Sequence, residues 1–417
     1  MQHRNIFFAA LLLLSSIQLV SQNNTNSPYT RFGYGDLTEG TASELRGMGG
    51  VGIANRSKST INALNPAAYS SVDSLTFQFD VGAGARFSHF MTKGTDGNLS
   101  NSAFNANLEY LTMRFPLGKW LGFSAGLLPY SFSGYNFYQT DSLTVDRGAA
   151  EEERKVYYTR SFNGSGGFSQ IYGGLSLNLF NHVSLGVNTY YMFGDVNNSR
   201  IVSYNPTIIN ASMETNRIHV SDLRVRYGLQ FYNTFADKHD VVLGVIYENK
   251  TKFDGNFVRQ LNNDTIDYTD GFELPQVLGV GLNYTFNKKL TVGFDYLQQN
   301  WGDALFFGKK DSLVNRTKLA FGAEYIPNPG GRRYSERIRY RVGFNTANQY
   351  YKINKLAPQN DYTFSFGVGL PTRTGKTMLN TSLEYGKIGS SSLLREDYLK
   401  VTFSASIDEH WFFKPKL

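Results

Sequence analysis

The sequence predicts an all-β protein: a transmembrane antiparallel β-barrel of about fourteen strands, preceded by a separate N-terminal segment. From Leu75 onward, apolar side chains alternate with polar residues or glycine, which is the period of a β-strand with one apolar face. The alternating segments are long enough to cross a bilayer, which takes about 9 to 11 residues in a tilted strand. The links between them are alternately short and long, as in bacterial outer-membrane barrels.

Residues 1–21 have the features of a signal peptide. His3 and Arg4 precede the apolar run Ile6–Leu14, and the small polar segment Ser15–Gln22 follows. A basic start, an apolar core and a small polar end are the plan of a secretory signal. We therefore expect the protein to be exported.

Residues 22–74 show no strand alternation and are rich in glycine, serine, alanine and asparagine. A segment of about fifty residues is long enough to enter the lumen of a barrel and occlude it. We expect it to form a hatch inside the barrel.

Residues 75–417 form the expected barrel, and its strands carry their apolar face outward. For example, Leu223 and Val225 alternate with Arg224 and Arg226. A polar interior and an apolar exterior are the inverse of a soluble barrel, so the apolar side must face lipid. The alternation predicts strands at approximately 75–91, 103–116, 119–138, 156–180, 182–204, 215–236, 239–259, 268–287, 289–305, 315–327, 335–352, 360–371, 376–389 and 396–412.

Aromatic residues gather where these strands should leave the hydrocarbon, and we interpret them as two interfacial girdles. A carbohydrate-stacking platform at Tyr350 and Tyr351 is the alternative for that pair. The loop-side group is Phe137, Tyr138, Tyr190, Tyr191, Trp301, Phe306, Phe307, Tyr350 and Tyr351, and the turn-side group is Trp120, Phe180, Phe235, Phe286 and Trp411.

Several arginines fall on the polar face of the strands and are expected in the lumen: Arg86, Arg224, Arg226, Arg339 and Arg341. They could line a path for anions. Ion pairs are the preferred interpretation, because a narrow lumen penalises unpaired charges. The expected acidic partners are Asp80, Glu109, Asp295, Glu324 and Glu384.

The sequence lacks the patterns of an enzyme or a metal site. It has 0 cysteines, which excludes disulfides and thiolate sites, and its 6 histidines are scattered without metal-binding spacing. No G-x-S-x-G marks a nucleophile, and the glycines at 47, 49 and 52 follow no strand that would make them a dinucleotide site. The net charge of +7 is spread along the chain, which disfavours nucleic acid. We expect no catalytic activity, no cofactor and no metal.

Three stretches before the barrel resemble the hatch of the FadL family of outer-membrane transporters: Arg31–Asp36, Arg46–Asn55 and the tripeptide Asn65-Pro66-Ala67. The resemblance covers nearly the whole mature chain, because a hatch followed by a barrel of this size is also that family's architecture. It implies uptake of long-chain fatty acids or similar hydrophobic molecules through a gated lumen. The hatch residues it points to are Arg31, Phe32, Gly33, Gly47, Gly49, Gly50, Asn65, Pro66 and Ala67. The start Ser27–Gly33 and the ending Trp411–Lys414 are also similar to barrels of the Bacteroidota.

In the FadL family, the hatch and a kink in the third strand open a lateral path from lumen to lipid. The resemblance therefore implies a side opening where a proline and several glycines weaken the pairing of the third predicted strand with the fourth. Ordinary bulges are the other interpretation. The residues concerned are Pro129, Gly134, Gly164, Gly166 and Gly167.

One departure from the family leaves the function open. The loop Gln139–Lys155 is short and charged, whereas FadL-type transporters capture substrates on long apolar loops, and an apolar ligand gains nothing from a charged surface. The leading hypothesis is passive uptake of small hydrophobic molecules through the gated lumen, and the alternative is a non-transporting accessory subunit of an outer-membrane protein assembly or secretion complex. In both cases we expect a bacterial outer-membrane location. The expected partners are outer-membrane lipid, lipopolysaccharide and, during biogenesis, the outer-membrane insertion machinery.

Overall fold

The computed structural model describes residues 25–94, 97–145, 154–205, 210–253, 257–262, 264–268, 271–353, 359–372, 377–390 and 393–410. The predicted signal peptide and the Trp411–Lys414 ending lie outside these ranges. Among the described residues, no helix is long and apolar enough to span a membrane.

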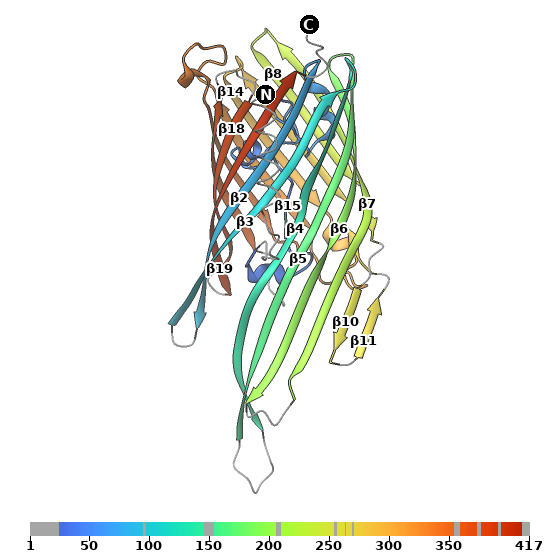
Figure 1. The fold of residues 1–417 in the computed structure, drawn as a ribbon, viewed down its shortest axis with the longest axis vertical. Helices are drawn as coiled ribbons and strands as arrows, with labels where there is room; N and C mark the ends of the chain where they lie inside the picture. Colours follow the sequence, from blue (N-terminus) through green and yellow to red (C-terminus); the bar gives the residue numbers. More distant parts are fainter. Residues whose placement is uncertain are drawn as a thin grey trace, which may run out of the picture.

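Fourteen antiparallel strands close into a barrel, which confirms the predicted fold class (Figure 1). Each barrel strand pairs with the next one along the chain, and the last pairs with the first, so the sheet closes on itself. The strands are β2 (Thr76–Gly94), β3 (Gly97–Pro116), β4 (Leu121–Val145), β5 (Arg154–Leu179), β6 (Val183–Asn205), β7 (Ser212–Phe235), β8 (His239–Glu248), β13 (Val277–Phe286), β14 (Leu290–Gln299), β15 (Arg316–Tyr325), β16 (Arg339–Asn348), β17 (Asn360–Pro371), β18 (Thr377–Ser390) and β19 (Leu394–His410).

The predicted strands 239–259 and 268–287 are too long, because β8 ends at Glu248 and β13 begins only at Val277. Pro275 lies just before β13 and has no N–H to donate to a ladder, which helps to explain the late start. Four short strands lie between them. β9 (Thr251–Lys252) pairs with β12 (Glu273–Leu274), while β10 (Phe257–Leu261) pairs with β7 and with β11 (Asp264–Tyr268).

The two faces of the wall are arranged as predicted. On the outside, Phe366 and Phe403 are 59% and 60% exposed, while their lumen-facing neighbours Ser365 and Thr402 are buried. So much exposed apolar surface is stable only against lipid. The turn-side aromatics Trp120, Phe180, Phe235 and Phe286 are also exposed, as a periplasmic girdle requires. Trp411 lies outside the described residues.

The loop-side aromatics do not form one ring. Tyr191, which pairs with Ile171, is exposed as a girdle would be, whereas Tyr138 is exposed farther along β4, beyond the apolar face of the wall. Phe307 is 38% exposed and Phe137 is half-buried. The girdle prediction is wrong for five others, which are buried because the lumen or the loops that fold back over it enclose them: Tyr190, Trp301, Phe306, Tyr350 and Tyr351. The carbohydrate platform at Tyr350 and Tyr351 is wrong for the same reason, since a sugar cannot stack on a covered ring.

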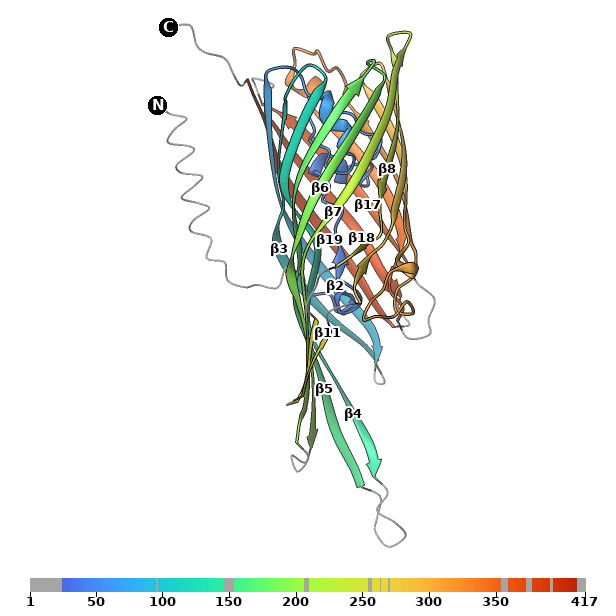
Figure 2. The ribbon, with the colours of Figure 1, turned by 90° about the vertical axis from the view of Figure 1, so that its right-hand side faces the viewer.

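One side of the wall is much taller than the other. Strands β4, β5, β6 and β7 have 25, 26, 23 and 24 residues, whereas β13, β14, β15 and β16 have 10 each. The tall strands project beyond the barrel as long hairpins, and β10 and β11 lie beside them (Figure 2). The charged stretch Gln139–Lys155, expected to be a loop, therefore belongs partly to β4 and β5.

The opposite end of the barrel has tight turns. Phe180 with Asn181, Ala236 with Asp237, and Asn287 with Lys288 all have positive φ in adjacent pairs. Two successive residues with positive φ make the type I′ turn that matches the twist of a hairpin. The link between β15 and β16 is longer and contains the 3-10 helix η4 (Tyr334–Arg337). Short turns mark the periplasmic end of such barrels.

Residues 25–74 lie inside the barrel, enclosed by its wall, where Figure 1 shows them as blue ribbon. Their regular elements are short: η1 (Pro28–Arg31), β1 (Asp36–Leu37), the helix α2 (Ser43–Arg46) and η2 (Pro66–Ser71). Val51, Ala54 and Tyr69 are completely buried. We call residues 25–74 the N-terminal segment.

Candidate functional site

Glycines on the lumen face of the wall make room for the N-terminal segment. A methyl group at Gly343 would overlap the backbone nitrogen of Gly49, and one at Gly244 would overlap the carbonyl oxygen of Ile53. Without a side chain, one backbone can approach another this closely. The wall glycines in such contact with the segment's backbone include Gly122, Gly186, Gly244, Gly281, Gly322, Gly343 and Gly367, and Gly228 faces the side chains of Asn65 and Pro66.

Polar side chains of the wall bind the segment's backbone. Gly52 and Ile53 donate their N–H groups to one carboxylate oxygen of Asp295, at 2.6 and 2.8 Å. The N–H of Gly49 donates to the Ser365 hydroxyl at 2.9 Å. The Gly49 N–H also donates to the carbonyl oxygen of Arg46 at 3.0 Å, whereas Asp295 satisfies the buried N–H groups of Gly52 and Ile53.

Arg114 on β3 holds the periplasmic end of the segment through hydrogen bonds. No sequence motif indicated this role. Its guanidinium is fully buried and donates to the carbonyl oxygens of Ser57, Lys58 and Ala68 at 3.1, 2.8 and 3.3 Å. It also donates to the Ser71 hydroxyl at 3.0 Å. Arginine suits this position because it offers five donors in a fixed plane. The available signal was that Arg114 falls on the lumen-facing side of its strand.

The first group of predicted hatch residues lies at the extracellular end of the segment. The Arg31 guanidinium carbon is 4.0 Å from the ring centroid of Phe162, and Phe32 stacks on Tyr351 with the centroids 5.2 Å apart. Gly33 has a φ of 59°, and its α-carbon faces the ring of Tyr350.

The second group forms the turn after α2. Gly49 and Gly50 have φ values of 72° and 81°, in the left-handed region that favours glycine. Gly47 faces Gly367 of the wall, and Gly50 lies beside the Lys318 ammonium. The G-rich run is therefore a tight turn fitted against the wall.

The third group, the Asn65-Pro66-Ala67 tripeptide, begins η2. The Asn65 side chain accepts the Ala67 N–H at 3.0 Å and donates to the carbonyl oxygen of Ile53 at 2.7 Å. Pro66 contacts the wall glycines, and the carbonyl oxygen of Ala67 accepts from the hydroxyls of Ser176 and Ser184 at 2.8 and 2.7 Å. The tripeptide thus links two parts of the segment to each other and contacts strands β5, β6 and β7.

The five predicted lumen arginines all lie beside carboxylates. Arg86 pairs with Glu396 at 2.8 Å and with Asp36 of the segment at 2.9 Å. Arg341 and Arg339 pair with Glu324 at 2.6 and 3.9 Å. Arg224 and Arg226 share Glu248. These arginines therefore form ion pairs, which was the preferred prediction, and do not line a path for anions in this structure.

The expected acidic partners were only partly identified. Glu324 binds the expected arginines, while Glu109 pairs with Arg46 and Lys400 instead, at 2.8 and 2.7 Å. Glu384 lies 3.7 Å from Arg46. Asp80 and Asp295 pair with no lumen arginine among the described residues, because Asp80 faces the Tyr110 hydroxyl and Asp295 binds backbone. The sequence analysis did not identify Glu248 or Glu396.

Glu39 is a further charged anchor of the segment. It binds the Lys318 ammonium at 2.5 Å, and Arg316 lies 3.7 Å away. Burial raises the pKa of Glu39, but these two cations outweigh burial, so the pKa lies below its ordinary value. The carboxylate is therefore ionised at neutral pH and ties the segment to β15.

An apolar cluster, which we call the aromatic cap, closes the extracellular half of the lumen. At its centre the ring of Tyr34, which is completely buried, contacts five other rings with centroids 5.1 to 6.4 Å away. The Tyr34 N–H donates to the Tyr350 hydroxyl at 2.8 Å. The cap consists of Tyr34, Phe168, Phe253, Phe272, Trp301, Phe306, Tyr350 and Tyr351.

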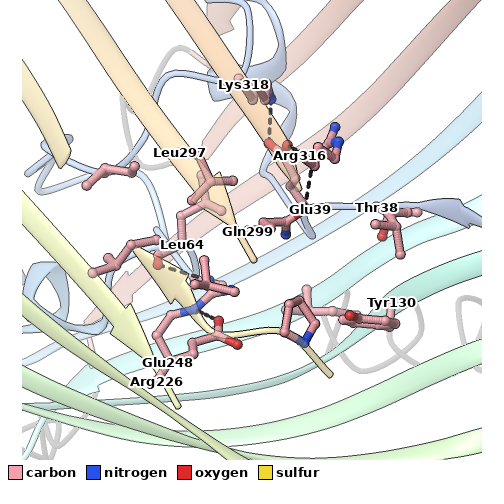
Figure 3. A pocket seen from close by; sticks show the side chains of 18 of the residues that line it. Thr38, Glu39, Leu64, Tyr130, Arg226, Glu248, Leu297, Gln299, Arg316 and Lys318 are labelled. Atoms are coloured by element: carbon pink, nitrogen blue, oxygen red, sulfur yellow. Dashed lines mark hydrogen bonds and ion pairs between the residues drawn. The ribbon is translucent and has the colours of Figure 1, made fainter. Parts of the chain in front are cut away.

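The cavity between the segment and β14 and β15 is small and has a mixed lining. Its volume is about 60 Å³. Figure 3 shows charged residues around it, such as Glu39, Arg226 and Lys318, together with the apolar Leu64 and Leu297. An apolar cavity of about 150 Å³ can hold benzene, so this space is too small for such a ligand.

Two larger spaces have mainly polar linings. A chamber of about 190 Å³ is lined by Arg86, Glu109, Asp361 and Lys400, among others. A vestibule of about 690 Å³ lies beside the short turns, near Asn181 and Lys288. Neither is lined as an apolar ligand requires.

The pairing between β3 and β4 stops part-way along the wall. It runs only from Pro116↔Gly122 to Leu111↔Leu127, although both strands continue far beyond these pairs. We call the unpaired stretch the β3–β4 seam. The N-terminal segment occupies part of it, because β1 pairs with β4 through Asp36↔Phe132 and Leu37↔Ser131. The seam is therefore closed by the segment at this level.

The expected side opening between β4 and β5 is not observed. These strands pair from Leu121↔Leu177 to Val145↔Arg154, with a single register shift between Pro129 and Ser131. A bulge accommodates the proline, and the ladder resumes beyond it. The glycines of β5 allow close contacts with the adjacent strands. Gly164 faces the ring of Tyr135, while Gly166 and Gly167 face backbone carbonyl oxygens and have φ values of 109° and 145°. The interruption in strand pairing lies instead on the side of β4 that faces β3.

A family model described as BamG matches residues 2–417. The chain belongs to the BamG family. No curated protein sequence matches it.

Solved structures of similar shape are FadL-type channels. The toluene transporter TodX of Pseudomonas putida has 15% identity and a TM-score of 0.56, covering 90% of this chain and 100% of that chain. The toluene transporter TbuX of Ralstonia pickettii has 16% identity and a TM-score of 0.57, covering 89% and 99%. A Pseudomonas aeruginosa FadL homologue has 14% identity and a TM-score of 0.56, covering 89% and 98%. At such identities the likeness shows the fold: this BamG-family chain is a FadL-like outer-membrane barrel.

Proposed function

We propose that this barrel is a non-transporting accessory subunit of an outer-membrane protein assembly complex, with residues 25–74 as a hatch that stays in place. The family name belongs to the Bam series, which denotes outer-membrane assembly. The observation that carries the proposal is the filled lumen. The aromatic cap and the segment leave one cavity of about 60 Å³ with a mixed lining, while the larger spaces of about 190 and 690 Å³ are lined mainly by polar and charged residues.

A subunit needs a stable surface rather than a passage. The anchors described above stabilise the segment from several strands at once, through Asp295, Ser365, Arg114 and Lys318. Leaving any of these buried groups unpaired costs about 1 to 3 kcal/mol. Opening the lumen would break several of them together, so the occluded state is favoured.

The test is affinity purification of the full-length protein in mild detergent, with lipid analysis of the same sample. The proposal expects a fixed stoichiometry of other envelope proteins and no bound hydrophobic small molecule. A monomeric barrel that carries a stoichiometric fatty acid or hydrocarbon would contradict it.

Passive uptake of hydrophobic molecules is the second candidate, and the β3–β4 seam favours it. TodX and TbuX, whose fold this barrel shares, are toluene transporters, and a seam between two strands offers a route from lumen to lipid. In this case the segment would have to move away from β4 to admit the substrate.

A disulfide lock tests this candidate directly. Leu37 and Ser131 are antiparallel partners, whose α-carbons lie within the distance that a disulfide bridges, and the chain has 0 cysteines to interfere. Uptake through the seam predicts that L37C/S131C cells lose hydrophobic-solute uptake under oxidising conditions and regain it on reduction. Equal uptake in both conditions would exclude this route.

A further inference from the structure

Beyond the part of β4 that the N-terminal segment covers, a stretch of strand edge has no partner. Gly134 is the last residue held on this edge: its N–H donates to the Thr30 hydroxyl at 3.0 Å, and its carbonyl oxygen accepts from the same hydroxyl at 3.1 Å. Both groups therefore point away from β5.

In an antiparallel ladder, the direction of the backbone groups alternates with each residue. Asn136, Tyr138 and Thr140 must then also direct their N–H and C=O groups away from β5. Among the described residues, no other strand pairs with them on that side. The stretch ends at Ser142, whose N–H donates to the Asp141 carboxylate at 2.8 Å. We call residues 136–140 the open edge.

The open edge lies above the membrane. The outward apolar face of β5 ends at Ile171, opposite Leu127, and the next outward positions are serine, glycine and asparagine. Asn136 pairs with Asn163, eight residues beyond Ile171, which is roughly 26 Å along the strand. Lipid chains therefore do not cover this edge.

The composition of the open edge does not protect it. It contains neither proline nor lysine, the residues that commonly block edge strands. Such an edge is a template for another strand, and β1 already uses the adjoining part of β4 in this way.

The charges beside the edge indicate what the added strand should carry. Arg160 pairs with Gln139 of the open edge, and the Asp141 carboxylate lies 3.8 Å from its guanidinium. The Nε atom of Arg160 is buried and has no hydrogen-bond partner among the described residues. Arg31 adds a second positive charge on the neighbouring Phe162 ring. An acidic side chain on the arriving strand would be attracted to this pair of arginines.

We propose that the open edge of β4 is a docking site for an extended polypeptide segment of another envelope protein, exposed on the cell-surface side and carrying an acidic residue. The partner's polypeptide pairs with β4 as an added strand, antiparallel or parallel, next to the pairing that β1 already makes with β4. This inference rests on the proposed function, since it names the edge through which the subunit meets one partner.

The test is photo-crosslinking in living cells from a benzoylphenylalanine placed at Tyr138, which is 76% exposed. Thr140→Pro removes one N–H of the open edge and leaves the β5 ladder intact, because that N–H does not point toward β5. Thr140→Ala is the matched control, and migration on unboiled gels verifies that each barrel is folded. Arg160→Gln, which lies on β5, is a second variant that leaves the open edge unchanged.

The expected result is one protein adduct, mapped to a single extended peptide of the partner. It should be unchanged in Thr140→Ala and weaker by about tenfold in Thr140→Pro, the loss that one buried backbone hydrogen bond produces. Arg160→Gln should weaken it as well. An adduct with lipopolysaccharide alone or an adduct between two copies of this chain would overturn the inference. Equal amounts of adduct in Thr140→Pro and Thr140→Ala would overturn it as well. If the protein co-purifies with other envelope proteins while Thr140→Pro and Arg160→Gln crosslink normally, the docking site is wrong but the proposed function stands. If no envelope protein co-purifies, the proposed function itself is wrong.

Discussion

Two backbones approach each other closely along the lumen wall of this protein, and single glycines make that possible. A glycine in a strand ordinarily weakens it, because it adds flexibility and packs no side chain. Here the cost is offset by the buried hydrogen bonds that the N-terminal segment gains, such as those from Gly52 and Ile53 to Asp295. The same glycine on the outer face would gain nothing.

Gly343→Ala tests this steric fit. The added methyl would overlap Gly49, and overpacking of a fitted interior typically costs about 1 to 3 kcal/mol. We expect a lower unfolding temperature in detergent and faster proteolysis of the N-terminal segment. Gly173→Ala is the control, because nothing lies within 4 Å of a methyl group there. Equal behaviour of the two variants would contradict the account.

Glu39 makes the anchoring of the segment depend on pH. Its pKa is lower in the docked state than its ordinary value of 4.5, because Lys318 and Arg316 outweigh the effect of burial. A lowered pKa stabilises the docked state above the ordinary value, and this contribution is lost as the pH falls through the lowered one.

Hydrogen exchange of the segment should therefore accelerate as the pH is lowered below about 4.5, after correction for the intrinsic pH dependence of exchange. Glu39→Gln should remove this acid-dependent component and show weaker protection already at neutral pH. If the variant retains the full acid-dependent change, other carboxylates control the anchoring.

Strand periodicity explains what the sequence could predict about the wall. Alternation located the strands and separated outward residues such as Phe403 from inward ones such as Arg341. It could not locate the seam, because the pairing of β3 with β4 depends on how far each strand continues beside its neighbour. It also placed Trp301 and Tyr350 at the membrane interface, since a strand pattern does not show that loops fold back over the lumen. Arg114 and Glu248 escaped notice because their partners lie far away in the sequence.

The aromatic cap should behave as one cooperative element around Tyr34. Replacing such a buried aromatic by alanine typically costs about 3 to 5 kcal/mol. With Tyr34→Ala, we expect Trp301, which contacts Tyr34, to become accessible to the fluorescence quencher acrylamide. The measurement uses a background with Trp120 and Trp411 replaced by phenylalanine, since the chain has 3 tryptophans. Tyr138→Ala, at an exposed position, should leave Trp301 protected; an unchanged Trp301 in Tyr34→Ala would show that the cap does not depend on its centre.

The tall and short sides of the wall give the whole molecule a definite orientation. Tight turns belong in the periplasm and long hairpins at the cell surface. Because the chain has 0 cysteines, single cysteines report the two sides cleanly. Tyr138→Cys should react with an impermeant maleimide on intact cells. Phe180→Cys, at a residue 89% exposed in a short turn, should react only after the outer membrane is permeabilised. The reverse pattern would invert the orientation.

The position of the N-terminal segment has a consequence for how the barrel is made. This stretch precedes every barrel strand in the chain, and β19, the last strand, completes the circle by pairing with β2. A ring whose diameter grows with its number of strands can shut around a solid object at only one size. We therefore expect the segment to set the size of the ring: a ring with fewer strands could not pass around it, and one with more would leave its glycines and carboxylates without contacts.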